Sequence, residues 1–240
     1  MKSLRVVLLS TVAVIALEGA ASAQDMSYKS NPTVYSWTGG YIGANVGVAH
    51  LDGTCGPTAA SYGYYLTCGS YYGNANTTIN ATSIAGGAQA GYDWQSGSFV
   101  YGVAADWSWT GLRGTAYGSD FGYYEAKANV DWLASVRGRA GLAVDKTMVY
   151  FTGGLALGGV HGDFIYGGTS YGTVSKVNVG WVAGLGLEHR FTPNWSAFAE
   201  ALYYDLGSVK GGMYTYSVET YQNQYYFQVM EARVGLNYRF

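Results

Sequence analysis

The chain has 240 residues and a formal net charge of −2 at pH 7, so it lacks the basic excess of a nucleic-acid-binding protein. Charged residues make up only 12%, and no uninterrupted apolar run of about 18 residues follows the N-terminus, which disfavours membrane-spanning helices. The 24 tyrosines, 7 tryptophans and 36 glycines, the glycines without a collagen-like period, instead favour a closed all-β protein with belts of aromatic side chains.

The N-terminus is typical of an export signal. Two basic residues precede a mostly apolar core, and an Ala-Ser-Ala cleavage motif ends at Ala23. We therefore expect residues 1–23 to be a signal peptide, residues 24–36 to be a polar periplasmic tether, and residues 37–240 to form the folded domain.

Eight segments of the folded domain alternate apolar and polar side chains at a period of two, which is the pattern of strands with one apolar face. In chain order they span residues 37–50, 82–94, 99–109, 130–144, 148–161, 176–190, 195–206 and 226–240. Each is long enough for the roughly 9 to 11 residues that a tilted strand needs to cross a bilayer. The segments therefore predict membrane-spanning strands.

Long and short connections alternate between these segments. Loops rich in glycine and tyrosine are predicted at residues 51–81, 111–129, 162–175 and 207–225, and short turns at residues 95–98, 145–147 and 192–194. Outer-membrane barrels place short turns in the periplasm and long loops outside. We therefore predict an all-β fold: an eight-stranded antiparallel transmembrane β-barrel with four long extracellular loops and three short periplasmic turns.

Charged side chains fall on one face of the predicted strands. The predicted interior charges are Asp93, Asp106, Asp131, Arg137, Arg139, Glu188, Arg190, Glu200, Glu231, Arg233 and Arg239. Their absence from the opposite face is expected in a membrane, where an arginine or lysine at the midplane costs about 2 to 4 kcal/mol. Because eight strands leave an interior only wide enough for side chains, we expect these charges to pair in a desolvated network that plugs the lumen.

Aromatic residues on the opposite face predict two girdles. Those near the loop ends are Trp107, Trp109, Trp132 and Trp181, and those near the turn ends are Trp94, Phe99, Phe151, Trp195, Tyr238 and Phe240. A soluble β-sandwich also tolerates charges on its solvent face, but it has no reason to carry two aromatic belts. The girdles therefore favour the barrel over the sandwich.

The two cysteines, Cys55 and Cys68, both lie in the first predicted loop. In an exported protein such a pair most simply forms one disulfide. A zinc site would need two more ligands at suitable spacing, and the segment offers none, so no metal is expected.

Several runs resemble the small outer-membrane β-barrel proteins of alphaproteobacteria, a porin family similar to the transmembrane domain of OmpA. They include WTGGYIGANVG, VRGRAGLAVDKTMVYFTGGLALG and ARVGLNYRF. The resemblance implies a barrel in the Gram-negative outer membrane, in contact with outer-membrane lipid and lipopolysaccharide. It also implies insertion by the barrel-assembly machinery, for which Tyr238 and Phe240 resemble the recognition signal. Some relatives are described as hemin-binding or as antigens.

The sequence carries no recognisable catalytic motif and implies no cofactor. It has no G-x-S-x-G elbow, and none of the three histidines is paired at strand spacing with a serine and an acid, so we expect no enzyme. Two function classes remain: a structural barrel that supports the envelope and displays its loops, and a porin for small solutes. Surface hemin binding by His50, His161 or loop tyrosines is a further alternative. The tyrosine-rich loops are also candidates for peptide or protein ligands, whereas the oligomeric state is not indicated.

Overall fold

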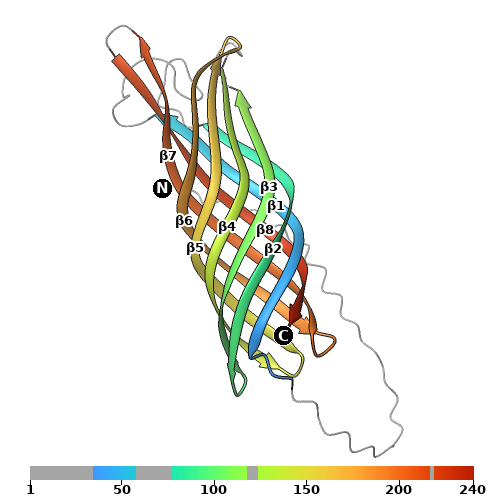
Figure 1. Cartoon of the computed structure of the whole chain (residues 1–240). Coiled ribbons are helices and arrows are strands. Elements are labelled where there is room, and N and C mark those ends of the chain that lie inside the picture. The colour runs from blue at the N-terminus through green and yellow to red at the C-terminus, as the bar shows by residue number, and fades with distance from the viewer. Residues whose placement is uncertain (1–34, 58–76, 118–123, 217–218) are drawn as a thin grey trace, which may run out of the picture. The chain divides into compact units, whose positions relative to one another are not determined.

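The computed structural model describes residues 35–57, 77–117, 124–216 and 219–240, which form a closed antiparallel barrel of eight strands (Figure 1). In chain order the strands are β1 Gly39–Pro57, β2 Thr77–Ser96, β3 Phe99–Tyr117, β4 Tyr124–Val144, β5 Thr147–Tyr166, β6 Thr169–Arg190, β7 Trp195–Tyr216 and β8 Glu219–Arg239. No helix within these ranges is long and apolar enough to cross a membrane. The predicted eight-stranded fold is confirmed.

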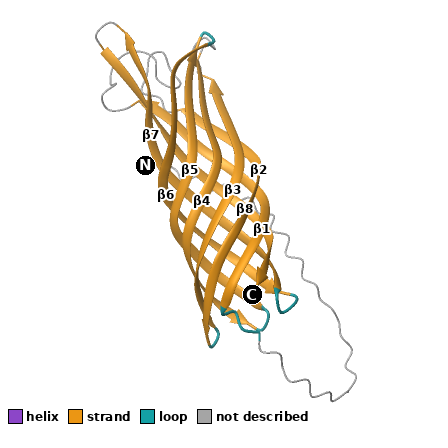
Figure 2. Cartoon of the chain, viewed as in Figure 1, coloured by secondary structure: helices purple, strands orange, loops and turns teal. Residues whose placement is uncertain are grey.

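The barrel closes because the first strand pairs with the last. β1 pairs with β2 on one side and with β8 on the other, where Ala44 lies opposite Leu236. Every strand is therefore hydrogen-bonded on both edges. Figure 2 shows the strands arranged around the closed ring. Closure removes the unpaired backbone groups that a sheet edge would expose, and this is what allows strands to lie in lipid.

The three short turns lie at one end of the barrel, as predicted. They join Ser96 to Phe99, Val144 to Thr147 and Arg190 to Trp195. In the first two turns Gly97 and Asp145 have φ angles of 61° and 51°, the left-handed conformation that tight hairpins require. We call this the turn end, and the opposite end of the barrel the outer end.

The strands extend further toward the outer end than predicted. The predicted third loop, residues 162–175, is almost entirely strand, and β5 and β6 are joined only by Gly167 and Gly168. Both glycines have positive φ angles, 56° and 81°, which suits a two-residue hairpin turn. The loop prediction was wrong here because the alternation of apolar and polar residues fades where both faces of a strand meet water.

The other three predicted loops are also shortened by strand. β7 and β8 occupy all of residues 207–225 except 217–218. In the first two loops, the parts left between strands are residues 58–76 and 118–123, which lie outside the described residues. The signal peptide and the tether up to residue 34 lie outside them too and stay predictions.

Trp37 does not begin the first strand, as the sequence suggested, but enters the barrel. Its side chain is completely buried at the turn end, where it packs with Met148 and Tyr150. Its backbone N–H donates a 2.7 Å hydrogen bond to Gln95 Oε1 on β2. The chain therefore crosses the inner mouth of the barrel before it joins β1 at Gly39.

The outer half of the interior is apolar, whereas the alternation predicted a polar lumen. Its members include Leu51, Ile79, Leu112, Val130, Leu133, Val160, Leu206, Tyr225, Phe227 and Val229, all nearly or completely buried. We call this set the outer apolar cluster. The charged residues therefore concentrate in the half of the interior nearer the turn end.

Candidate functional site: paired charges in the barrel interior

Eight of the eleven predicted interior charges meet in two rings of ion pairs. The turn-end ring contains Asp93 of β2, Arg139 of β4, Glu188 of β6 and Arg239 of β8. The middle ring contains Asp106 of β3, Arg137 of β4, Glu200 of β7 and Arg233 of β8. Acids and arginines alternate around each ring, so every charge has two neighbours of opposite sign.

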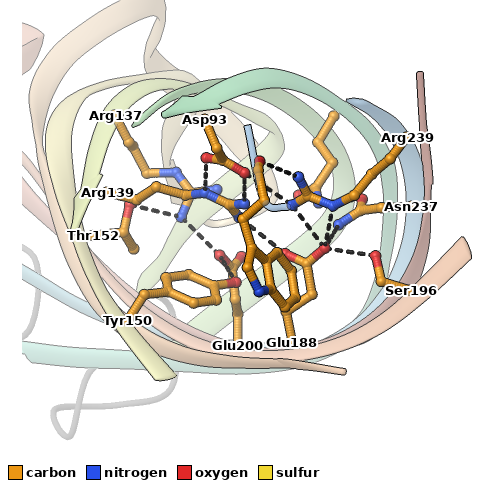
Figure 3. A network of polar contacts seen from close by, with 12 residues as sticks. Asp93, Arg137, Arg139, Tyr150, Thr152, Glu188, Ser196, Glu200, Asn237 and Arg239 are labelled. Atoms are coloured by element: carbon orange, nitrogen blue, oxygen red, sulfur yellow. Dashed lines mark hydrogen bonds and ion pairs between the residues drawn. The ribbon is translucent and has the colours of Figure 1, made fainter. Parts of the chain in front are cut away.

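In the turn-end ring each acid touches both arginines (Figure 3). Arg139 Nε donates to Asp93 Oδ1 at 2.6 Å, and Arg139 Nη1 lies 3.1 Å from Glu188 Oε2. Arg239 Nη2 lies 2.8 Å from Asp93 and 3.1 Å from Glu188. All four side chains are at most 4% exposed. The ring therefore joins four alternate strands across a desolvated interior.

A glycine makes room for one of these pairs. Asp93 lies opposite Gly102 on β3, and Gly102 lies opposite Arg139 on β4. A methyl group on Gly102 would come 2.3 Å from Asp93 Oδ1. Because β3 presents only hydrogen at this position, Arg139 reaches across it to Asp93.

Neutral polar side chains also donate hydrogen bonds to Glu188. Ser196 Oγ donates to Glu188 Oε1 at 2.6 Å, and Asn237 Nδ2 donates to the same oxygen at 3.0 Å (Figure 3). Removing charges from water costs several kcal/mol per ion unless pairing and additional hydrogen bonds compensate. The hydroxyl and the amide supply those additional bonds.

Aromatic rings hold the arginines from the side. The Arg139 guanidinium lies 4.6 Å from the ring centre of Tyr41 and 5.0 Å from that of Tyr150. The Arg239 guanidinium lies 4.7 Å from the ring of Trp37 and donates to the Trp37 carbonyl at 3.2 Å. Such cation–π contacts contribute about 2 kcal/mol or more where water is excluded.

The middle ring is closed in the same way. Arg137 Nη2 lies 2.8 Å from Asp106 Oδ1, and Arg137 Nη1 lies 3.4 Å from Glu200 Oε1. Arg233 Nη2 lies 2.6 Å from Glu200, and its Nη1 lies 3.4 Å from Asp106. Ser135 Oγ donates to Asp106 at 2.6 Å. As in the turn-end ring, a hydroxyl supplements the ion pairs.

Tyr150 connects the two rings. Its hydroxyl donates to Glu200 Oε1 at 2.8 Å, while its ring lies beside Arg139 of the turn-end ring (Figure 3). Gln89 makes a second connection, because it donates to Asn237 at 2.8 Å and accepts from Arg233 at 3.5 Å. The paired charges thus form one continuous network.

Two predicted members lie inside the barrel but outside the rings. Arg190 is at the turn end, where it donates to the carbonyl oxygens of Ser36 and Pro193. Glu231 is 2% exposed and makes no ion pair among the described residues; its carboxylate lies beside the Tyr204 hydroxyl and near Arg233 without a well-aligned hydrogen bond. Glu231 therefore stands as a buried acid between the middle ring and the outer apolar cluster.

Asp131 was predicted to face the interior, and this was wrong. A bulge interrupts β4 between Val130 and Trp132, so one extra residue stands against β5. Val130 and Leu133 are both fully buried, whereas the Asp131 side chain is 42% exposed. The bulge reverses which residues face inward and turns Asp131 to the outside of the barrel.

The same bulge overturns a second expectation, that no histidine is paired with a serine and an acid. His161 of β5 lies with Nδ1 2.9 Å from Asp131 Oδ2 and Nε2 2.9 Å from Ser175 Oγ of β6. These residues are far apart in sequence, and only the cross-strand register brings them together.

Sequence reasoning missed the aromatic residues that enclose the arginines. Tyr41 lies opposite Gly91, and Tyr150 lies opposite Gly186. A methyl group on either glycine would come 2.4 Å from its tyrosine, so each ring lies over bare backbone. A tyrosine on the polar face that pairs with a glycine was the signal available in the sequence.

The structure describes only one of the two cysteines of the predicted disulfide. Cys55 is fully buried and is not a free thiol, but Cys68 lies outside the described residues, so their pairing stays a prediction. Among the described residues no cluster of three or more His, Cys, Asp or Glu side chains is arranged to hold a metal ion.

The exterior carries the predicted aromatic residues in contact with one another. Toward the outer end, the rings of Trp107 and Trp109 lie 4.3 Å apart. At the turn end, Tyr238 packs against Trp195 at 5.2 Å and against Phe240 at 5.4 Å. Between them the outward side chains are apolar and exposed, as lipid contact requires.

Comparison with known proteins agrees with the barrel fold. Residues 10–240 match the family described as outer membrane protein beta-barrel domain. The chain is 33% identical to a 31 kDa outer-membrane immunogenic protein of Brucella melitensis, over 98% of this chain and 99% of that protein. It is 28% identical to a 25 kDa outer-membrane immunogenic protein of Brucella abortus, over the full length of both. Among solved structures, OprG from Pseudomonas aeruginosa superposes with a TM-score of 0.56 at 10% identity, covering 86% of this chain and 99% of that one, which shows a shared fold.

Proposed function

The chain belongs to the outer-membrane protein β-barrel family and resides in the Gram-negative outer membrane, and we propose that it is a structural barrel whose interior is closed to solutes. In this role it supports the envelope and presents its outer strand ends to the surroundings. The observation that carries the proposal is the pair of buried charge rings, which join strands on opposite sides of the barrel.

The width of the barrel supports a closed interior. Eight strands leave space only for side chains, and here that space holds two consecutive rings of ion pairs. A solute that passes must separate charges such as Arg139 and Glu188. Leaving a buried charge without its partner costs about 3 to 5 kcal/mol, so the passage has a high barrier.

The outer apolar cluster supports the same conclusion independently. Leu112, Leu133 and Phe227 are completely buried inside the outer half of the barrel. A hydrated ion that enters from outside would lose its water against these side chains before it reached the first charge. Two barriers of different chemistry therefore lie in series along the barrel axis.

Solute transport is the competing function, and liposome swelling distinguishes the two. Vesicles that contain the purified full-length protein should swell in an isotonic small sugar no faster than protein-free vesicles. Vesicles that contain Arg139→Ala/Arg239→Ala should also swell no faster, because the middle ring and the outer apolar cluster still close the interior. Fast swelling with the wild-type protein would show that it transports solutes and would contradict the proposed closed barrel. The gel mobility of unboiled samples verifies that each variant is folded.

The proposed partners are lipid and lipopolysaccharide around the apolar belt and the barrel-assembly machinery at β8. Surface hemin binding and loop ligands stay predictions. One nitrogen of each outer histidine already contacts a neighbouring hydroxyl: His50 Nδ1 lies 2.7 Å from Thr82 Oγ1, and His161 Nε2 lies 2.9 Å from Ser175 Oγ. An axial haem ligand at those nitrogens would have to break these contacts.

A further inference from the structure

A serine, a histidine and an aspartate align on the outer surface of three consecutive strands. They are Asp131 on β4, His161 on β5 and Ser175 on β6. We propose that they form a hydrolytic site for ester-linked acyl chains of lipids in the outer leaflet. The activity would be additional to the structural role proposed above, and neither depends on the other.

Each nitrogen of the imidazole lies close to one of the groups that acyl transfer needs. Nε2 lies 2.9 Å from Ser175 Oγ, within reach to accept the hydroxyl proton. Nδ1 lies 2.9 Å from Asp131 Oδ2, where the carboxylate favours the tautomer with its proton on Nδ1. The contact at Nδ1 has an ion-pair distance without hydrogen-bond alignment. Such contacts are often poorly aligned before substrate binds and tighten with it.

The β5–β6 register and the bulge in β4 bring the three side chains together. His161 pairs directly with Ser175, so the two side chains stand side by side on the outward face. In a regular strand Asp131 would share the inward face with Leu133 and Ser135. The bulge in β4 directs it outward to His161 instead, and bulges of this kind are frequent beside active sites, where they re-aim one side chain.

The three residues lie at the boundary between the apolar belt and the polar outer end. The next outward positions toward the turn end include Val177 and Val179, which are 52% and 66% exposed. The next outward position on β5 toward the outer end is Asp163, which accepts hydrogen bonds from Ser170 and Thr173. This is the level at which membrane proteins change from hydrocarbon to headgroup contacts.

The position of the three residues at this boundary indicates the class of substrate. The ester bonds of membrane lipids join the acyl chains to the headgroup region, so they lie where hydrocarbon meets polar groups. An acyl chain packed along the exposed valines of β6 would bring its ester carbonyl to the level of Ser175. The Ser175 side chain is exposed, and those of His161 and Asp131 are 41% and 42% exposed, so lipid and water both have access.

The reaction balances with water as the only co-reactant. Ser175 Oγ bonds to the ester carbonyl carbon while its proton passes to His161 Nε2. When the tetrahedral intermediate collapses, the ester C–O bond breaks and the lipid alkoxide takes that proton from His161. Water then attacks the acyl-serine with His161 as base, releasing a fatty acid and restoring the hydroxyl. Asp131 acts as a positioning residue, since it touches only the histidine.

A second histidine on the same surface serves as an internal control. His50 lies 2.7 Å from the Thr82 hydroxyl, but its other nitrogen is 3.8 Å from Asp52, an ion-pair distance too long for a hydrogen bond. A hydroxyl and an acid beside a histidine are therefore present at both places, and only His161 has both at hydrogen-bonding distance. His50→Ala should leave lipid hydrolysis unchanged.

The first test is labelling by a fluorophosphonate, which forms a covalent bond to an activated serine with loss of fluoride. We expect the folded full-length protein to be labelled at Ser175, as located by peptide mass spectrometry. Ser175→Ala should not be labelled, and His161→Ala should be labelled at least about 10²-fold more slowly. A wild-type protein that remains unlabelled at Ser175, or labelling at Ser175 that is unchanged in His161→Ala, would overturn the proposal.

The second test measures fatty acid release from two lipid sources in separate arms, phosphatidylethanolamine vesicles and purified lipopolysaccharide. Release in either arm that falls at least about 10²-fold in Ser175→Ala supports the site and identifies its lipid. Asp131→Asn should lower kcat with KM unchanged, and Asp131→Glu should recover part of it, as a positioning role requires. No release from either lipid, or equal release by Ser175→Ala, means that the three residues form only a surface hydrogen-bond network.

Discussion

The two halves of the barrel interior are filled by different kinds of side chain, charged in one half and apolar in the other. Near the turn end, eight buried charges are arranged so that each arginine touches two acids. Toward the outer end, leucine, valine and aromatic side chains fill the same narrow space, and the acid at the boundary, Glu231, makes no ion pair among the described residues. A charge is therefore stable inside this barrel where strand register provides two ion-pair partners, and it costs stability where, as at Glu231, register provides no ion pair among the described residues.

The largest expected effect comes from removing one cation of a ring. Arg139→Ala leaves Asp93 and Glu188 each with one arginine fewer in a desolvated site. We expect the free energy of unfolding to fall by about 3 to 5 kcal/mol, because the loss exposes uncompensated buried charge. Urea unfolding in lipid vesicles, followed by tryptophan fluorescence, measures this change.

The matched control is an ion pair outside the barrel interior. Lys127 lies 3.5 Å from Glu125, and both side chains are more than a third exposed. Lys127→Ala should change the free energy of unfolding by less than about 1 kcal/mol. Equal effects of the two alanine variants would mean that the rings contribute no more than surface pairs.

A smaller loss of stability is expected where a methyl group is added next to the turn-end ring. Gly102→Ala places a methyl group 2.3 Å from Asp93 Oδ1 and forces the Asp93–Arg139 pair to move. We expect a loss of about 1 to 3 kcal/mol, typical of overpacking. The outward Gly138 has no neighbouring atom closer than 3.9 Å, so Gly138→Ala should unfold like the wild type. The same urea titration compares the two, and destabilisation by Gly138→Ala alone would contradict the packing argument.

Glu231, the buried acid that lies outside the rings, should respond in the opposite direction. Glu231→Gln has nearly the same shape but no charge to desolvate, so we expect the free energy of unfolding to rise by about 1 to 3 kcal/mol. The corresponding change in the middle ring, Glu200→Gln, should lower it, since two arginines then lose part of their compensation. A loss of stability in Glu231→Gln would show that this carboxylate has an ion-pair partner in the folded protein.

The smallest effect on stability is expected at the C-terminus. Phe240 is 74% exposed, and its backbone N–H donates one hydrogen bond to the Gly40 carbonyl at 3.1 Å. Deleting Phe240 should leave the urea midpoint of the refolded barrel almost unchanged. It should nevertheless reduce insertion into the outer membrane of cells, if the residue acts as the assembly signal. Normal insertion measured by cell fractionation would count against that role.

The sequence predicted the faces of the strands better than it predicted contacts between them. Alternation assigned Glu231, Arg233 and Arg239 to the interior of the last strand, and all three are buried there. Alternation cannot predict that Arg239 meets Glu188 across the lumen, because that contact depends on closure, on register and on the tilt of eight strands at once.

The failures of sequence reasoning have local causes. One bulge, which leaves no mark in the composition of β4, moved Asp131 to the exterior beside His161, which the β5–β6 register already pairs with Ser175. The turn at Gly167 and Gly168 was hidden because alternation fades in water-exposed strands. Trp37 was assigned to a strand by pattern continuity, although its burial beside Arg239 follows from a cation–π contact that pattern alone does not reveal.

The central claim, that the charge rings and the outer apolar cluster close this barrel, is tested most directly by electrical recording in planar bilayers. We expect no steady conductance from purified wild-type protein, and none from Arg139→Ala/Arg239→Ala while it keeps the gel mobility of a folded barrel, because the middle ring and the outer apolar cluster remain in place. Large, reproducible channels from the wild-type protein would contradict the claim.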